Sequence, residues 1–184
     1  LQTSDGSHFF RLAGGNWVQE SFVDARLSNG VDGREDVLWN GSELFVLVYS
    51  SKPNLYKYTY DTALDVYNLV SGFPVGFSIP SGHETIVLDQ DSTGRLWATY
   101  EAGGNAYVAY TTSADHRSWA APGVVLRSGL NDDDISAVVR FGGNRVGVFW
   151  SDQNRWEFGF RYHADGDAPD QWSSVEIVRP GTGN

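Results

Sequence analysis

The stretch GRLWATY, from Gly94 to Tyr100, decides how the chain is organised, because related forms of it occur three times. GSELFVLVY ends at Tyr49 and GNRVGVFW ends at Trp150, so the three stretches end 51 and 50 residues apart. Each follows a glycine-containing turn and is rich in valine, leucine and aromatic residues, which favour β-strands. A fixed period of this length predicts a repeated structural unit.

Further short runs with the composition of β-strands lie between these stretches. The runs are LYKYTY (55–60), TIVLD (85–89), AYVAYTT (106–112), AVVRF (137–141) and EFGFRYH (157–163). No window of twelve or more residues shows helical periodicity. Four strands in about fifty residues are typical of a β-propeller blade. The sequence therefore predicts an all-β propeller fold.

The repeat divides the chain into blades. Residues 1–30 form the outer half of one blade, and full blades follow at 31–79, 80–129 and 130–180. An aromatic residue recurs near the end of each unit, at Trp17, Tyr67, Trp119 and Trp172. Together the units make a single propeller region, 1–184. Because propellers have about four to eight blades, we expect a fragment or an incomplete ring, which a second chain would complete.

Composition narrows the range of partners. The net charge is −10, so phosphate-rich nucleic acids and anionic membranes would be repelled. There are no cysteines, which excludes disulfides and thiolate metal sites. No apolar run approaches the ~20 residues of a membrane-spanning helix. We expect neither a nucleic-acid partner nor a transmembrane segment.

The segment TTSADHRSWAAP (111–122) resembles the Asp-box, the bacterial neuraminidase repeat of sialidase-like propellers. Ser113, Asp115, Ser118 and Trp119 match the box, although its glycine is absent and the motif is one residue short. Looser forms occur in HADGDAPDQW (163–172) and TYDTALDVY (59–67), and the whole chain is similar to secreted bacterial propellers of this type. The resemblance implies a structural turn between the third and fourth strands of a blade. It also implies an extracellular or cell-surface location.

The same resemblance suggests sialidase activity as a function to consider. A sialidase needs an arginine triad, a Tyr–Glu nucleophile pair and an acid/base aspartate. Arginines would bind the substrate carboxylate through paired hydrogen bonds. Arg34, Arg95 and Arg140 are the arginines nearest to the first strands of the blades, but they do not occupy equivalent positions. No catalytic residue is therefore predicted.

An acidic residue comes immediately before the predicted first strand of every full blade. Aligning GREDVLW, SGHETIV and NDDDISA places Asp36, Glu84 and Asp134 in register, 48 and 50 residues apart. The position before them holds Glu35, His83 and Asp133. Equivalent positions converge at one mouth of a propeller channel, so these six residues are candidates for binding a ligand or a cation.

Three interpretations of these acids stay open. Each acid caps a turn by accepting backbone hydrogen bonds, or the ring binds Ca²⁺ through oxygen ligands, or some of the acids contact or hydrolyse a sugar. Trp156 and Tyr56 are candidates for stacking on sugar rings, with packing between blades as the alternative. No other cofactor is predicted.

The sequence favours a non-catalytic, extracellular or cell-surface propeller module that binds carbohydrate or protein. The first alternative is part of a sialidase-like or other propeller glycoside hydrolase. The second alternative is a structural assembly subunit. Fold alone does not choose among them, because propellers support all three roles.

Overall fold

Every regular element of the structure is a β-strand. The computed structural model describes residues 2–3, 6–20, 34–49, 51–81 and 84–179. Within these ranges no helix is present, so none is long and apolar enough to cross a membrane. The chain divides into two compact units, 1–76 and 77–184. The prediction of an all-β chain is confirmed.

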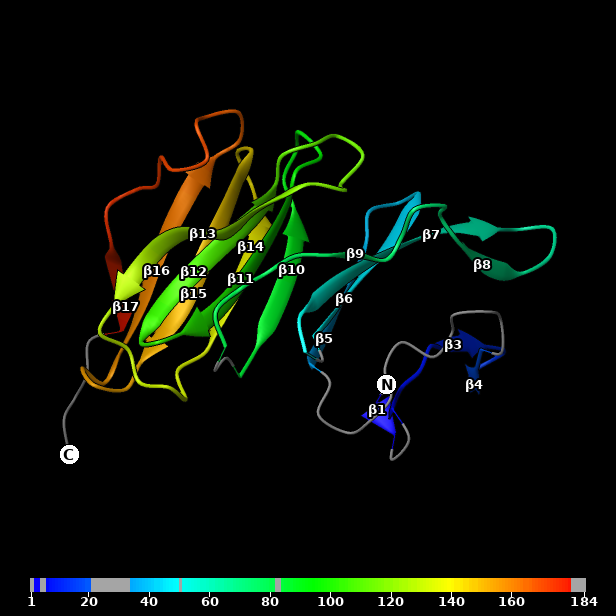
Figure 1. The fold of residues 1–184 in the computed structure, drawn as a ribbon, viewed down its shortest axis with the longest axis horizontal. Coiled ribbons are helices and arrows are strands. Elements are labelled where there is room, and N and C mark those ends of the chain that lie inside the picture. The colour runs from blue at the N-terminus through cyan, green and yellow to red at the C-terminus, as the bar shows by residue number, and fades with distance from the viewer. Residues whose placement is uncertain (1, 4–5, 21–33, 50, 82–83, 180–184) are drawn as a thin grey trace. The chain divides into compact units, whose positions relative to one another are not determined.

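The second unit contains two four-stranded antiparallel sheets, each a meander in chain order. Figure 1 shows them as two layers, one in green and one running from yellow to red. The strands of the first sheet are β10 (Ile86–Gln90), β11 (Leu96–Ala102), β12 (Asn105–Thr111) and β13 (Trp119–Ser128). The strands of the second sheet are β14 (Ser136–Phe141), β15 (Arg145–Asp152), β16 (Glu157–Ala164) and β17 (Glu176–Arg179). The repeated sequence stretches form β11 and β15, the second strand of each sheet.

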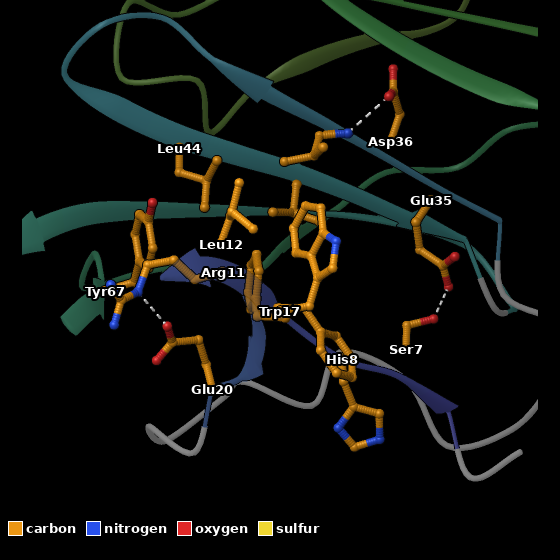
Figure 2. Close-up of a pocket in the computed structure, with 14 residues that line it drawn as sticks. Ser7, His8, Arg11, Leu12, Trp17, Glu20, Glu35, Asp36, Leu44 and Tyr67 are labelled. Atoms are coloured by element: carbon orange, nitrogen blue, oxygen red, sulfur yellow. Dashed lines mark hydrogen bonds and ion pairs between the residues drawn. The ribbon is translucent and has the colours of Figure 1, made fainter. Parts of the chain in front are cut away.

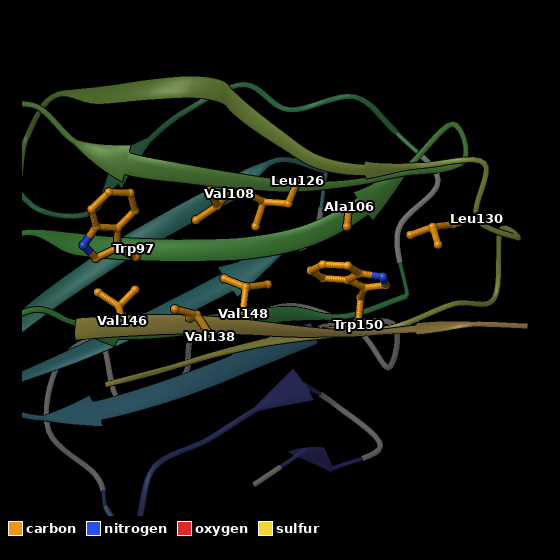
Figure 3. Packing of buried hydrophobic residues seen from close by; sticks show 9 residues of the cluster. All are labelled: Trp97, Ala106, Val108, Leu126, Leu130, Val138, Val146, Val148 and Trp150. Carbon is orange, nitrogen blue, oxygen red and sulfur yellow. The ribbon is translucent and has the colours of Figure 1, made fainter. Parts of the chain in front are cut away.

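The core of the second unit lies between these two sheets. Figure 3 shows Trp97 and Trp150 near opposite ends of a row of aliphatic side chains. The row includes Val108 from the first sheet and Val138, Val146 and Val148 from the second. Burial of each large apolar side chain stabilises the fold by roughly 1.5–3 kcal/mol. This interface is therefore the main source of stability in the unit.

A glycine makes room for one of the two core tryptophans. Gly159 on β16 is the cross-strand partner of Trp150 on β15. A Cβ added at Gly159 would lie 2.3 Å from ring atom Cε2 of Trp150. The indole therefore lies flat across the glycine, a close approach that no other residue type permits.

Polar groups also join the two sheets. The Ser92 amide donates to Oδ2 of Asp165 at 2.8 Å. Arg127 on β13 donates through Nη2 to buried Asp152, at the end of β15, at 3.0 Å. Asp152 also accepts from Nη1 of Arg155 at 2.7 Å, so its buried charge is paired with two guanidinium groups.

The first unit is built from one larger sheet and two hairpins. Its larger sheet contains β5 (Arg34–Trp39), β6 (Glu43–Tyr49), β7 (Pro53–Asp61) and β8 (Val66–Leu69), with β9 (Val75–Gly76) paired to β7. The hairpins are β1 (Gln2–Thr3) with β2 (Gly6–Ser7), and β3 (Phe10–Ala13) with β4 (Asn16–Gln19). A small cluster of Leu44, Val46, Val48 and Tyr58 is buried, with Phe9 and Tyr67 packed against it.

Candidate functional site

The first unit contains a pocket of about 830 Å³ between the β3–β4 hairpin and the β5–β8 sheet. Its residues come from the β1–β4 segment and from β5, β6 and β8. The lining residues are Ser7, His8, Phe9, Phe10, Arg11, Leu12, Trp17, Glu20, Glu35, Asp36, Val37, Leu44, Val46 and Tyr67. Apolar and aromatic side chains make up most of the wall, which is typical of ligand pockets.

Two of the acids singled out in the sequence lie in this pocket. Glu35 and Asp36 are neighbours on β5, the strand that begins at Arg34. The Ser7 hydroxyl donates to Oε1 of Glu35, and the Val37 amide donates to Oδ1 of Asp36 at 2.9 Å. An ionised carboxylate has about four acceptor positions. The contact with Ser7 therefore leaves the Glu35 carboxylate capable of accepting further hydrogen bonds.

An exposed tryptophan faces the same space. Trp17 on β4 has 72% of its surface exposed, although it lines the pocket. Figure 2 shows its ring among the drawn residues, with Arg11 and Glu20 on one side and Ser7 and Glu35 on the other. Sequence analysis noted Trp17 only as a repeating aromatic residue and did not predict that it would line a site.

The arginine in the pocket is held by two carboxylates. Nε of Arg11 donates to Oε1 of Glu20 at 2.7 Å, and Nη2 donates to Oδ2 of Asp65 at 2.7 Å. The Tyr60 hydroxyl also donates to Asp65. The hydrogen bond from Tyr60, followed by the charge of Arg11, lowers the pKa of the Asp65 carboxyl. Asp65 is therefore an anion at neutral pH and a stable partner for Arg11.

In the second unit the predicted acids behave differently from those on β5. Asp134 is fully buried just before β14. It accepts hydrogen bonds from the amide of Asn131 at 2.7 Å, the hydroxyl of Ser151 at 2.8 Å and the amide of Gln153 at 3.0 Å. These contacts match the interpretation in which the acid caps a turn. Asp133 beside it is exposed.

The corresponding acid before β10, Glu84, is exposed, and His83 lies outside the described residues. Asp36 belongs to the first unit, whereas Glu84 and Asp134 belong to the second. Among the residues that the structure describes, no group of three or more His, Asp or Glu side chains could hold a metal ion.

A buried acid near Asp134 was not predicted from the sequence. Glu101 on β11 is 2% exposed, and the Thr85 hydroxyl donates to its Oε2 at 3.1 Å. Its Oε1 has no hydrogen-bond partner among the described residues. Burial raises the pKa of Glu101 to about 7, although the hydroxyl groups of Ser136 and Thr85 oppose the shift, and the charge of Asp134 contributes a smaller increase. No pattern in the apolar stretch LWATYEA marks this residue as special.

The segment that resembles the Asp-box forms a tight turn between β12 and β13. Ser113 Oγ donates to Oδ1 of Asp115 at 2.6 Å, and the Arg117 amide donates to the same oxygen at 3.1 Å. The Ser118 amide donates back to Ser113 Oγ at 3.1 Å. Trp119 stacks on Phe77 with ring centroids 4.3 Å apart. All four matched residues thus serve the turn or the packing beside it.

The two aromatic residues predicted to stack on sugars have different surroundings. Trp156 is 68% exposed in the turn between β15 and β16, where its φ is 55°. Tyr56 on β7 is half-buried, packs against the core cluster of the first unit and stacks on Tyr58 at 6.3 Å. Trp156 is accessible to a ligand, whereas Tyr56 takes part in packing.

No protein-family model and no curated protein matches the sequence. The solved structure of a GH43 β-1,3-galactosidase aligns with a TM-score of 0.50 and 16% sequence identity, over 96% of this chain and 42% of that one. A protein of unknown function from Dyadobacter fermentans aligns at a TM-score of 0.30 with 10% identity, over 78% of this chain and 68% of that one.

The GH43 enzyme is a propeller protein, so the first likeness supports a fold of the β-propeller kind. The chain spans about two fifths of the length of that structure. At such low identity the likeness concerns the fold alone. The number of blades in the ring stays a prediction.

Proposed function

We propose that this chain is a propeller module that binds glycans in the pocket of the first unit. The observation that carries the proposal is the exposed indole of Trp17 in the same pocket as the carboxylate of Glu35. A sugar ring has an apolar C–H face and a rim of hydroxyl groups. An aromatic ring can stack on that face while charged acceptors bind the hydroxyls.

The dimensions of the pocket agree with this role. Its volume of about 830 Å³ lies within the range of small-molecule sites, roughly 300–1,000 Å³. Leu12, Val37 and Leu44 supply apolar wall, and polar side chains such as Ser7 and Glu35 lie beside them. This combination suits a ligand that is apolar on its ring faces and polar at its edges.

A glycan array followed by calorimetry on the best ligand tests the proposal. β-1,3-linked galactobiose belongs on the array because the matched GH43 enzyme is described as a β-1,3-galactosidase. We expect Trp17→Ala to abolish binding. Trp156→Ala is the matched control, since that tryptophan is equally exposed but lies in the other unit. Binding lost only in the Trp156 variant would refute the assignment of the site to this pocket.

A second candidate function is part of a propeller glycoside hydrolase. The likeness to a GH43 enzyme favours it, and so does the presence of Glu20, Glu35 and Asp36 in one pocket. Hydrolysis of β-1,3-galactan that Glu35→Gln or Asp36→Asn abolishes would establish this alternative. Binding without turnover would favour the binding module.

A third candidate, an assembly subunit, is favoured by one sheet face in the second unit. Val139, Phe149 and Phe158 on β14, β15 and β16 are 39–50% exposed. Exposed apolar patches of this kind often mark interaction surfaces. Sedimentation at several protein concentrations would show a stable oligomer if this role were correct.

The proposal also includes an extracellular or cell-surface location. It rests on the resemblance of residues 111–122 to the Asp-box of secreted propellers, whose hydrogen-bonded serine and aspartate occur in this turn. Fractionation of the producing cells tests the location directly. Recovery of the protein from the cytosol alone would contradict it.

A further inference from the structure

Arg11 is the one guanidinium group among the residues that line the pocket. Such a group would ordinarily bind the carboxylate of an acidic sugar through charge-assisted hydrogen bonds. Here its Nε and Nη2 already donate to Glu20 and Asp65, both at 2.7 Å. A ligand carboxylate could reach only the remaining N–H groups of Arg11, beside two anions that already balance its charge.

The rest of the pocket also disfavours a negative charge. Glu20, Glu35 and Asp36 line it, against the single Arg11. Hydrogen bonding to Glu20 raises the pKa of the Arg11 guanidinium, so its positive charge is retained but already balanced. Like charges in a partly desolvated site repel more strongly than in water.

We infer that Glu20 and Asp65 determine specificity by holding Arg11, so that the pocket takes neutral glycans and rejects acidic ones. This inference rests on the proposed function of the same pocket. Asp65 lies outside the pocket lining, in the β7–β8 turn, and acts as a positioning residue through Arg11. A neutral sugar needs only hydroxyl contacts to Glu35 and stacking on Trp17.

The first experiment compares each neutral oligosaccharide on the array with its counterpart oxidised to a uronic acid at C6. We expect the wild-type protein to bind the neutral member at least about tenfold more tightly, an energy difference of about 1.4 kcal/mol. In the double variant E20Q/D65N, Arg11 is released from both anions. Affinity for the acidic member should then rise by about tenfold, so that the preference for the neutral member is lost.

Glu43→Gln is the matched control for charge. Glu43 forms an ion pair with Lys57 at 2.8 Å in the same unit but does not line the pocket. It should leave the preference for neutral sugars unchanged. If E20Q/D65N merely loosened the hairpin, both neutral and acidic binding would fall together, and the inference would be overturned.

A second measurement does not depend on finding the natural glycan. In ¹H–¹⁵N spectra, addition of glucuronate should shift the Arg11 Nε–H resonance in E20Q/D65N and leave it unchanged in the wild-type protein. Equal shifts in both proteins would overturn the specificity inference while leaving glycan binding intact. Failure of every glycan to bind the wild-type protein would instead refute the proposed function.

Discussion

The two units use the same strand repeat but pack it differently. In the second unit, two four-stranded sheets face each other and bury Trp97 and Trp150 almost completely. In the first unit, a single large sheet faces two-stranded hairpins, and the pocket remains between them. The comparison indicates that one unit provides rigidity and the other leaves surface available for a ligand.

The surroundings of the repeating aromatic residue also differ along the chain. Trp119 stacks on Phe77 at 4.3 Å, and Trp172 meets Trp97 edge-on at 5.7 Å. Tyr67 stacks on Phe9 at 6.3 Å. Trp17, on the two-stranded hairpin, remains 72% exposed. The repeating aromatic residue therefore packs against another ring in three of the four sequence repeats and is exposed in the first.

The largest expected effect comes from the core of the second unit. Trp97→Ala should lower the free energy of unfolding by about 3–5 kcal/mol, because it leaves a cavity in a close-packed core. It also removes the hydrogen bond from the indole Nε1 to buried Asp91 at 2.8 Å. Urea denaturation followed by fluorescence and circular dichroism measures the change.

Trp17→Ala is the natural counterpart, since the same residue type is removed from the open unit. Its free energy of unfolding should stay within about 0.5 kcal/mol of the wild-type value, as is usual for exposed positions. Equal losses of unfolding free energy in the two variants would contradict this difference between the units. They would show that the first unit depends on its tryptophan for folding as strongly as the second.

The next effect is a dependence of stability on pH that originates in the second unit. The pKa of Glu101 is raised from 4.5 to about 7, so folding favours its protonated form. The stabilisation associated with that proton is present in full below pH 4.5 and is lost as the pH rises through about 7. The loss amounts to at most about 3 kcal/mol.

Glu101→Gln should remove this dependence, because the amide cannot ionise. The variant should be more stable than the wild-type protein at pH 8 and similar to it at pH 5. Unfolding curves recorded across that range test the prediction. If the free energy of unfolding changed equally in the wild-type protein and the variant between pH 5 and pH 8, the prediction would be wrong.

The fold was largely predictable because its signal is periodic. Strands with valine and aromatic residues recur about every fifty residues, and period alone is enough to indicate propeller-type sheets. Asp134 and the turn that contains Asp115 were also predicted from their positions in the repeat. Their contacts are local, so sequence neighbours determine most of their partners.

The pocket was only half predictable. Glu35 and Asp36 were found by alignment of strand starts, but Arg11, Trp17 and Glu20 were not. These three residues lie on or beside the β3–β4 hairpin, which is separated from β5 in the sequence. The sequence therefore contains no sign that they lie near Glu35. Glu101 was missed for a related reason, because its surroundings depend on Thr85 and Asp134, which lie just before β10 and β14.

The smallest of these effects tests whether equivalent acids serve different purposes in the two units. Asp134→Ala removes the acceptor for two backbone amides and one hydroxyl, and should cost about 2 kcal/mol of unfolding free energy. Asp133→Ala, next to it and exposed, should change stability by less than about 0.5 kcal/mol. Glu35→Gln in the first unit should instead weaken glycan binding. If Asp134→Ala left stability unchanged, the capping role would be wrong, and its buried carboxylate would need another explanation.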